Sequence, residues 1–219
     1  MLFRSGVAVD GDADRCVAVD EAGRIVDGDV LIALLALDRR ARGLKGSDRA
    51  VATILTNSAI ERRLGREGIA LERTPVGDRW VAERLAETDA GFGGEKSGHL
   101  LFPEFAPTGD GIISAINLVA LVARRREPLS AMVASVELDP QIQVVVPIGP
   151  GGADAILGDS DFAREAESAG AELVRSGGRL VVRPSGTEPL LRVMVEGEPR
   201  EAIEASARRI AEAVRSAAG

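Results

Sequence analysis

The sequence is poor in aromatic residues and in cysteine. Its 219 residues include five Phe, one Trp and no Tyr, so the core has to be built mainly from Val, Leu, Ile and Ala. Stacking of bases on aromatic rings, which supports single-stranded nucleic acid binding, is therefore not expected. The one cysteine, Cys16, excludes an internal disulfide and a cysteine-rich zinc site. Its apolar, strand-like surroundings predict a buried small side chain rather than a reactive thiol.

The chain also lacks an excess of positive charge and any long apolar run. Its net charge of −7 leaves no basic stripe for a nucleic acid backbone. No apolar run approaches membrane-spanning length, and the first residues do not form a signal peptide. We therefore expect a cytoplasmic globular protein that binds neither nucleic acid nor a membrane.

The first part of the chain has the pattern of an α/β domain. Strand-like segments at residues 50–55 and 70–74 alternate with helical segments at 30–42, 58–66, 80–87, 108–125 and 128–137. This alternation is typical of a parallel sheet covered by helices. We expect Asp29 to cap the first of these helices.

The composition changes at residues 138–140, where we place a domain boundary. Beyond it we predict a strand at 141–147, a flexible loop at 149–152 and a helix at 159–170. Paired strands at 180–183 and 190–196 and an amphipathic helix at 200–217 follow. The predicted fold class is thus α/β, with a mixed α/β domain followed by a smaller α+β domain that has an antiparallel sheet.

Three carboxylates stand at alternate positions in the stretch D-G-D-A-D-R at residues 10–15, which lies on a turn between two short predicted strands. Asp10, Asp12 and Asp14 repel one another at this spacing. Bound Mg²⁺ would relieve the repulsion, because it prefers carboxylate and phosphate oxygens, and it would keep positions for a ligand. The plain alternative is a solvated acidic turn.

Two other interpretations of the acidic stretch compete. In a calcium loop that starts at Asp10, Glu21 takes the twelfth position, but Arg15 takes the sixth, where glycine is needed. The flanks are also strand-like where helices belong. A strand that ends in D-x-D is likewise typical of phosphatases that phosphorylate their first aspartate, although the third aspartate and Arg15 are not expected there.

The loop at residues 93–99 gathers Glu95, Lys96, Ser97 and His99 between glycines, which let a backbone approach a ligand closely. In an extended segment Glu95 and Ser97 face the same side, where they can bracket adjacent hydroxyls of a sugar. His99, the only histidine, can exchange a proton with a hydroxyl or hold a phosphate. A purely structural histidine is the alternative. The glycines around Ser97 do not give the G-x-S-x-G motif of a Ser-His-Asp hydrolase.

A third polar turn lies between the last two predicted strands. Ser185 and Thr187 offer hydroxyls there, and Gly186 frees backbone N–H groups to form an anion-binding nest. Arg183 and Arg192, one on each strand, can close on one phosphate. The alternative is a hairpin connection with two solvated arginines.

Together the three turns resemble the α-D-phosphohexomutase superfamily, and most closely its phosphoglucosamine mutase family. The resemblance rests on D-G-D-A-D-R at 10–15, G-E-K-S-G-H at 94–99 and R-P-S-G-T-E-P at 183–189, in this order. V-G-D-R at 76–79 and T-G-D-G at 108–111 support it, and the match spans essentially the whole chain.

The resemblance implies an Mg²⁺-dependent isomerase that interconverts glucosamine 6-phosphate and glucosamine 1-phosphate through a phosphoserine and a bisphosphate. The implied metal ligands are Asp10, Asp12 and Asp14, and the implied catalytic residues are Arg15, Lys96 and His99. The residues implied to bind the sugar phosphate are Glu95, Ser97, Arg183, Ser185, Gly186, Thr187 and Arg192.

The family pattern also predicts how the chain is divided. Residues 1–28 would be a remnant of the metal-binding second domain, 29–137 the sugar-binding third domain and 138–219 the phosphate-binding fourth domain. The family's phosphoserine loop is missing from this sequence, so we expect a fragment that does not turn over sugar phosphate alone. A phosphomannomutase or phosphoglucomutase portion and a non-catalytic sugar-phosphate-binding module remain the alternatives.

Overall fold

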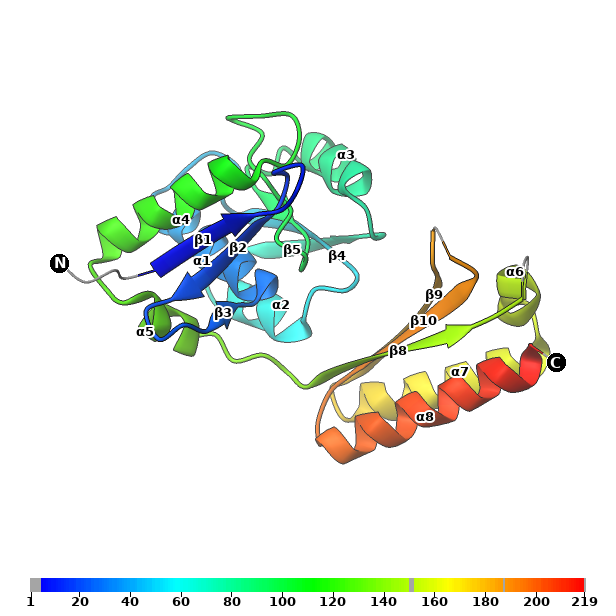
Figure 1. Ribbon diagram of the computed structural model, residues 1–219. Coiled ribbons are helices and arrows are strands. Elements are labelled where there is room, and N and C mark those ends of the chain that lie inside the picture. Colours follow the sequence, from blue (N-terminus) through cyan, green and yellow to red (C-terminus); the bar gives the residue numbers. More distant parts are fainter. Residues whose placement is uncertain (1–4, 150–151, 187, 219) are drawn as a thin grey trace. The chain divides into compact units, whose positions relative to one another are not determined.

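The computed structural model describes residues 5–149, 152–186 and 188–218. The chain forms two compact units, Met1–Leu138 and Asp139–Gly219 (Figure 1). The first unit is a mixed α/β unit, and the second is a smaller α+β unit with an antiparallel sheet. The predicted fold class is therefore confirmed.

The first unit begins with a small antiparallel sheet that carries the acidic turn. Its strands are β1 (Ser5–Val9), β2 (Cys16–Asp20) and β3 (Ile25–Val26), in the order β1-β2-β3. Val9 and Cys16 are direct partners, so the acidic stretch closes a hairpin. Cys16 is buried, as predicted, and its burial raises the pKa of the thiol.

A second sheet forms the centre of the first unit, with strands β4 (Arg49–Thr53), β5 (Ala70–Thr74), β6 (Gly93–Gly94) and β7 (Leu100–Leu101) in the order β5-β4-β6-β7. The strands predicted at 50–55 and 70–74 correspond to β4 and β5, which pair in parallel as predicted. Strands β6 and β7 were not predicted; β6 is parallel to β4, whereas β7 is antiparallel to β6. Residues 95–99 form a tight turn that reverses the chain direction, so β7 runs back alongside β6.

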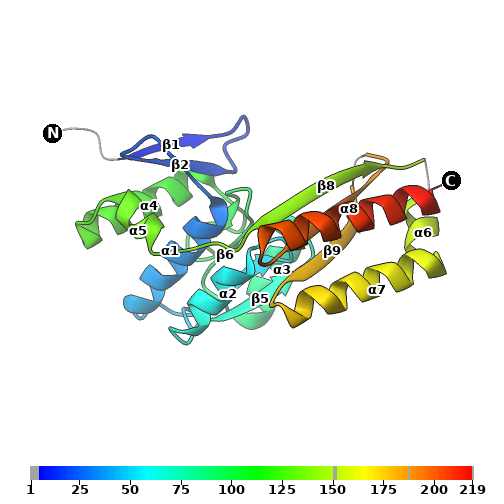
Figure 2. The same cartoon turned by 90° about the horizontal axis from the view of Figure 1, so that it is seen from below.

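Helices cover both faces of this sheet (Figures 1 and 2). The helices of the unit are α1 (Gly28–Ala41), α2 (Ser58–Gly65), α3 (Asp78–Thr88), α4 (Gly111–Arg125) and α5 (Leu129–Ala134). Ala50 and Ala52 of β4 face one core with α1 and α2, whereas Val51 faces a second core with Val81 and Leu85 of α3. The central strand is thus buried on both sides, as in other three-layer α/β folds.

The start of α1 differs from the prediction. The N-cap is Asp27, whose side chain accepts a hydrogen bond from the Asp29 amide. Asp29 lies inside the first turn and is fully buried. Gly28 can open the helix because its missing side chain lets the helix start lie directly against the Lys96 carbonyl oxygen, which a Cβ would overlap.

The second unit packs two long helices on one face of a three-stranded antiparallel sheet (Figures 1 and 2). The strands β8 (Gln141–Pro147), β9 (Arg179–Pro184) and β10 (Leu190–Glu196) follow the order β8-β10-β9. The helices are α6 (Gly152–Leu157), α7 (Ser160–Arg175) and α8 (Arg200–Ala217). Leu191, Val193 and Val195 of the central strand face α7 and α8 in the core.

Two predictions for this unit need correction. The expected loop at 149–152 is followed at once by α6, which begins at Gly152 and was not foreseen; residues 150 and 151 lie outside the described part. Helix α7 was predicted to end at Gly170 but continues to Arg175, so Gly170 lies within the helix.

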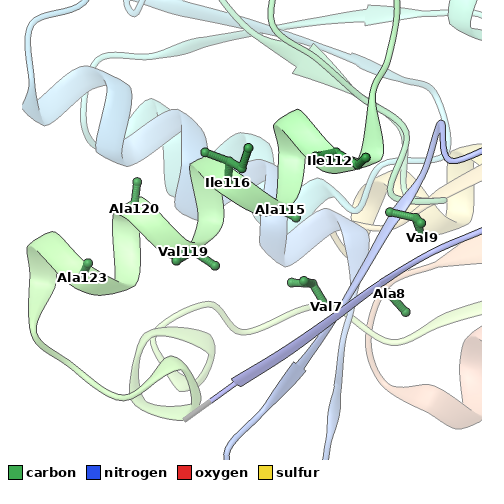
Figure 3. Close-up of a pocket in the computed structure, with 9 residues that line it drawn as sticks. All are labelled: Val7, Ala8, Val9, Ile112, Ala115, Ile116, Val119, Ala120 and Ala123. Carbon is green, nitrogen blue, oxygen red and sulfur yellow. The ribbon is translucent and has the colours of Figure 1, made fainter. Parts of the chain in front are cut away.

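An apolar groove of about 530 Å³ runs between β1 and α4. Figure 3 shows the residues that line it, among them Val7 and Val9 of β1 and Ile112, Ile116 and Val119 of α4. These five side chains are exposed. Among the described residues, no helix combines the length and the apolar character needed to cross a bilayer.

Candidate functional site

The acidic turn brings three carboxylates together. One oxygen from each of Asp10, Asp12 and Asp14 lies within 4.8 Å of the other two. The turn is closed by a hydrogen bond from the Ala13 amide to the Asp10 carbonyl (3.2 Å), and Ala13 takes a left-handed conformation with φ of 60°. Carboxylate oxygens this close repel one another, and a hard cation such as Mg²⁺ bound between them would remove that repulsion.

Glu21 does not belong to this cluster. Its carboxylate accepts hydrogen bonds from the amide of Ser130 (3.2 Å) and from the Ser130 hydroxyl, and the Ser130 hydroxyl holds the pKa of Glu21 below its usual value. Strands rather than helices flank the acidic turn. Both findings argue against the calcium-loop interpretation.

Arg15 borders the carboxylates. Its Nε lies 3.7 Å from Asp10 Oδ2 and 3.8 Å from Asp14 Oδ1, and its side chain is 52% exposed. Partial desolvation works to raise the pKa of Asp10, but the Arg15 amide, which donates to Asp10 Oδ1 (3.1 Å), and the guanidinium outweigh it and lower that pKa. Asp10 is thus held ionised, with the half-exposed Arg15 guanidinium beside it.

Backbone contacts join the acidic turn to two other segments. The Cys16 amide donates to the Gly98 carbonyl (3.0 Å), and the Gly111 amide, at the start of α4, donates to the Ala13 carbonyl (2.9 Å). A Cβ at Gly98 or at Gly111 would overlap these neighbours, and Gly98 has a φ of 88°. The close approach therefore depends on glycine at both positions.

His99 lies beneath the acidic turn. Its Nδ1 is 3.2 Å from Asp14 Oδ2, and the residue is only 3% exposed. The ring packs on Gly109, where a Cβ would collide with it. Within the described part of the chain, Nε2 has no hydrogen-bond partner. The imidazole is therefore placed to orient Asp14, and the structure brings it to the acidic turn.

Glu95 and Ser97 lie in a tight turn rather than in an extended segment. The Gly98 amide donates to the Glu95 carbonyl (3.0 Å), and the Glu95 amide donates to the His99 carbonyl (2.9 Å). Alternate residues face one side of an extended segment but not of such a turn, so the predicted extended conformation is wrong. Glu95 Oε1 instead accepts from the Gly77 amide (3.0 Å), and Ser97 is exposed.

Lys96 points its ammonium group at the start of α1. Its Nζ lies 3.4 Å from Asp29 Oδ2 and 3.5 Å from Asp27 Oδ2. Asp29 was predicted to cap a helix, and its contact with Lys96 was not predicted. Burial raises the pKa of Asp29 to about 6, against the opposing effect of Lys96. The feature of the sequence that could have predicted this contact is the pair of closely spaced carboxylates, Asp27 and Asp29.

The third polar turn lies in the second unit. Arg183 and Arg192 are direct partners across β9 and β10. Arg192 Nη2 lies 3.3 Å from Glu188 Oε2, and Ser185 donates its amide to the Leu190 carbonyl (2.9 Å). Gly186 is exposed, and Thr187 lies outside the described residues.

The candidate residues thus form two sets. One set lies in the first unit and comprises Asp10, Asp12, Asp14, Arg15, Glu95, Lys96, Ser97 and His99. The other lies in the second unit and comprises Arg183, Ser185, Gly186 and Arg192. The roles predicted for these residues remain predictions.

Two family models match the chain. Residues 27–138 match the model described as phosphoglucomutase/phosphomannomutase, alpha/beta/alpha domain III, and residues 138–213 match the model of the C-terminal domain of the same family. The chain is 44% identical over 213 residues to the phosphoglucosamine mutase of Symbiobacterium thermophilum, and this match covers 97% of the chain and 47% of that protein. It is 45% identical over 213 residues to the phosphoglucosamine mutase of Salinispora tropica, with 97% and 46% covered. The chain spans about half the length of these curated relatives.

Solved structures share the fold at lower identity. One from work on N-acetylphosphoglucosamine mutase of Aspergillus fumigatus matches with a TM-score of 0.82 and 23% identity, over 97% of this chain and 48% of that chain. A structure of that fungal enzyme in complex with GlcNAc-6P and magnesium matches with a TM-score of 0.78 and 23% identity, over 97% of this chain and 49% of that one.

Proposed function

This chain belongs to the phosphoglucomutase/phosphomannomutase family, of which it carries domain III and the C-terminal domain, and we propose that it acts as the sugar- and phosphate-binding part of a phosphoglucosamine mutase. The reaction is the interconversion of glucosamine 6-phosphate and glucosamine 1-phosphate in the cytoplasm. The relatives that share about 44% identity over nearly the whole chain bear that enzyme's name and support the choice of an amino sugar. The fungal complex with GlcNAc-6P and magnesium supports a sugar phosphate and Mg²⁺ as ligands.

One observation carries the phosphate part of the proposal. Arg183 and Arg192 stand directly opposite each other on adjacent strands, with Glu188 Oε2 3.3 Å from Arg192 Nη2, and two like charges in that position would be stabilised by a further anion. Two guanidinium groups can hold a phosphate dianion through charge-assisted hydrogen bonds. Ser185, Gly186 and Thr187 would complete this anchor, which binds the phosphate that is not reacting. Because the anchor would recognise the charge and geometry of the phosphate, it would accept the sugar in both orientations that the reaction requires.

We propose that the first unit carries the residues for the metal ion and for the reacting phosphoryl group. Asp10, Asp12 and Asp14 would hold Mg²⁺, which, when bound, neutralises charge that develops on the transferred phosphoryl group. Arg15, half exposed beside them, would donate hydrogen bonds to the oxygens of that group. His99 would keep Asp14 oriented. Glu95 and Ser97 would bind sugar hydroxyls, and Lys96 would fix the turn that carries them.

The proposed transfer uses a phosphoserine. Its phosphoryl group passes to a sugar hydroxyl: the bond from phosphorus to the serine oxygen breaks while the bond to the sugar oxygen forms. The resulting bisphosphate returns the phosphoryl group from its other end to the serine. We assign this serine to none of the residues of this chain, so the chain alone is expected to bind sugar phosphate without turning it over. In the same proposal, residues 1–28, 29–137 and 138–219 correspond to parts of domains II, III and IV.

Phosphorus-31 NMR tests the binding proposal. The resonance of glucosamine 6-phosphate should shift and broaden when the chain and Mg²⁺ are added. It should return towards its free position when Arg183→Ala replaces the wild type. An unchanged resonance with the folded wild-type chain would contradict the proposed function.

A further inference from the structure

A buried carboxylate lies at a junction of three segments in the first unit. Asp29, in the first turn of α1, has no exposed surface. Its Oδ2 accepts from the Asn57 amide (3.1 Å), and Asn57 is the residue that caps α2. The Lys96 ammonium lies 3.4 Å from the same oxygen. One side chain thus touches the starts of two helices and the turn at residues 95–98.

The backbone of that turn rests on the same helix start. A Cβ at Gly28 would overlap the Lys96 carbonyl oxygen and crowd the Gly98 amide nitrogen. The turn is therefore held against α1 both by this close backbone approach and by the ion pair. Asp27 adds a second contact, since its Oδ2 lies 3.5 Å from Lys96 Nζ.

The energetics of Asp29 do not favour a role in stability. A buried carboxylate is costly unless it is paired and hydrogen-bonded, and a buried ion pair seldom adds net stability over a neutral arrangement. Asp29 Oδ1 is buried and has no hydrogen-bond partner within the described residues. The charge is thus only partly compensated.

We propose that Asp29 is a positioning residue, which acts through Lys96 to hold the turn at residues 95–98 in the form that presents Glu95 and Ser97 to a sugar. The Lys96 ammonium is directed to α1, so the role of Lys96 is to link the turn to Asp29. The identity of the ligand rests on the proposed function, whereas the restraint on the turn does not.

The test is hydrogen exchange of two amides in the turn, those of Glu95 and Gly98, which donate to the His99 and Glu95 carbonyls. Asp29→Asn and Lys96→Met should each speed their exchange by at least about tenfold, since a charge-assisted contact is lost. The double variant should exchange no faster than Lys96→Met, because Lys96→Met already removes the contact that Asp29→Asn weakens. Lys96→Arg should restore slow exchange.

Two controls separate this restraint from general destabilisation. The Val51 amide, bonded to the Phe92 carbonyl (3.1 Å) in the central sheet, should keep its exchange rate in every variant. Lys45→Met breaks an exposed pair with Asp89 (3.0 Å) in the same unit and should leave the turn unchanged. If Asp29→Asn fails to fold, Lys96→Met tests the same contact at a partly exposed position.

Unchanged exchange in Lys96→Met, or effects that simply add in the double variant, would overturn the proposal. Titration of the same proteins with glucosamine 6-phosphate adds a functional measurement, in which affinity should fall by a similar factor. If the folded wild type binds no sugar phosphate, the proposed function fails, while the exchange measurement still decides whether Asp29 positions the turn.

Discussion

Arg183 and Arg192 are direct register partners on β9 and β10, so two guanidinium side chains leave the same face of the sheet at adjacent positions. Like charges directly opposite one another are destabilising, by up to about 1 kcal/mol. If the pair binds an anion, as proposed, stability and phosphate binding should respond differently when one arginine is removed.

Arg183→Ala should leave the free energy of unfolding unchanged or slightly higher and should abolish stabilisation by phosphate. Thermal unfolding with and without millimolar inorganic phosphate measures both effects. Arg200→Ala is the matched control, because Arg200 lies on α8 and pairs at the surface with Glu204 (3.1 Å). A variant that loses stability but still gains from phosphate would contradict the anchor.

Asp12→Asn should remove the response of the first unit to Mg²⁺. Wild-type protein should show a higher Tm in millimolar Mg²⁺, because the ion binds only the folded cluster of three carboxylates. Without Mg²⁺ the variant should be at least as stable as the wild type, since one repulsive charge is gone. Asp48→Asn, at an exposed residue paired with Arg49 (3.5 Å), should keep the Mg²⁺ response. An equal Mg²⁺ effect in both variants would disprove the site.

His99→Leu should weaken Mg²⁺ binding by roughly 10-fold to 100-fold, because a hydrogen-bonded partner orients a metal-binding carboxylate. The relevant contact is the one between His99 Nδ1 and Asp14 Oδ2 (3.2 Å). Calorimetric titration with Mg²⁺ checks this, and His99→Asn, which can still donate from a nearby position, should lose less. Full Mg²⁺ affinity in a folded His99→Leu protein would mean that the histidine only fills space.

Asp29 should make stability depend on pH in an unusual direction. Burial raises its pKa in the folded protein from the ordinary 3.8 to about 6. The folded state therefore holds this proton more tightly, and the resulting stabilisation is full below pH 3.8 and lost as pH rises through about 6. Between pH 5 and pH 7 the loss should be about 1.4 kcal/mol. Asp29→Asn should lack this component, so the difference in unfolding free energy between the two proteins should shift by that amount. A difference that is constant over this range would contradict the raised pKa.

Much of the fold could be predicted from local pattern. The strand Gln141–Pro147 and the helix Arg200–Ala217 have the predicted bounds, because prolines flank or end the first and a regular apolar face marks the second. The predicted N-cap of α1 was Asp29, whereas the observed N-cap is Asp27. Both Asp27 and Asp29 suit a cap, and only the contact of Gly28 with the distant Lys96 backbone decides between them.

The residues of the candidate site could be predicted from the sequence, but the residues that they contact could not. The Asp cluster, the Glu95–His99 turn and the paired arginines could be found because each is a short polar segment between glycines or strands. The contact of His99 with Asp14 and that of Lys96 with Asp29 join residues far apart in the sequence. They depend on how β2, α1 and the turn pack together, which periodicity does not specify.

The most direct test of the account is calorimetric titration of the purified chain, in Mg²⁺, with glucosamine 6-phosphate, glucose 6-phosphate and mannose 6-phosphate. We predict that glucosamine 6-phosphate binds tightest, that Arg183→Ala abolishes the heat of binding and that Arg200→Ala retains it. No heat from the folded wild-type chain with any of the three sugars, or full binding by Arg183→Ala, would contradict the proposed sugar-phosphate site.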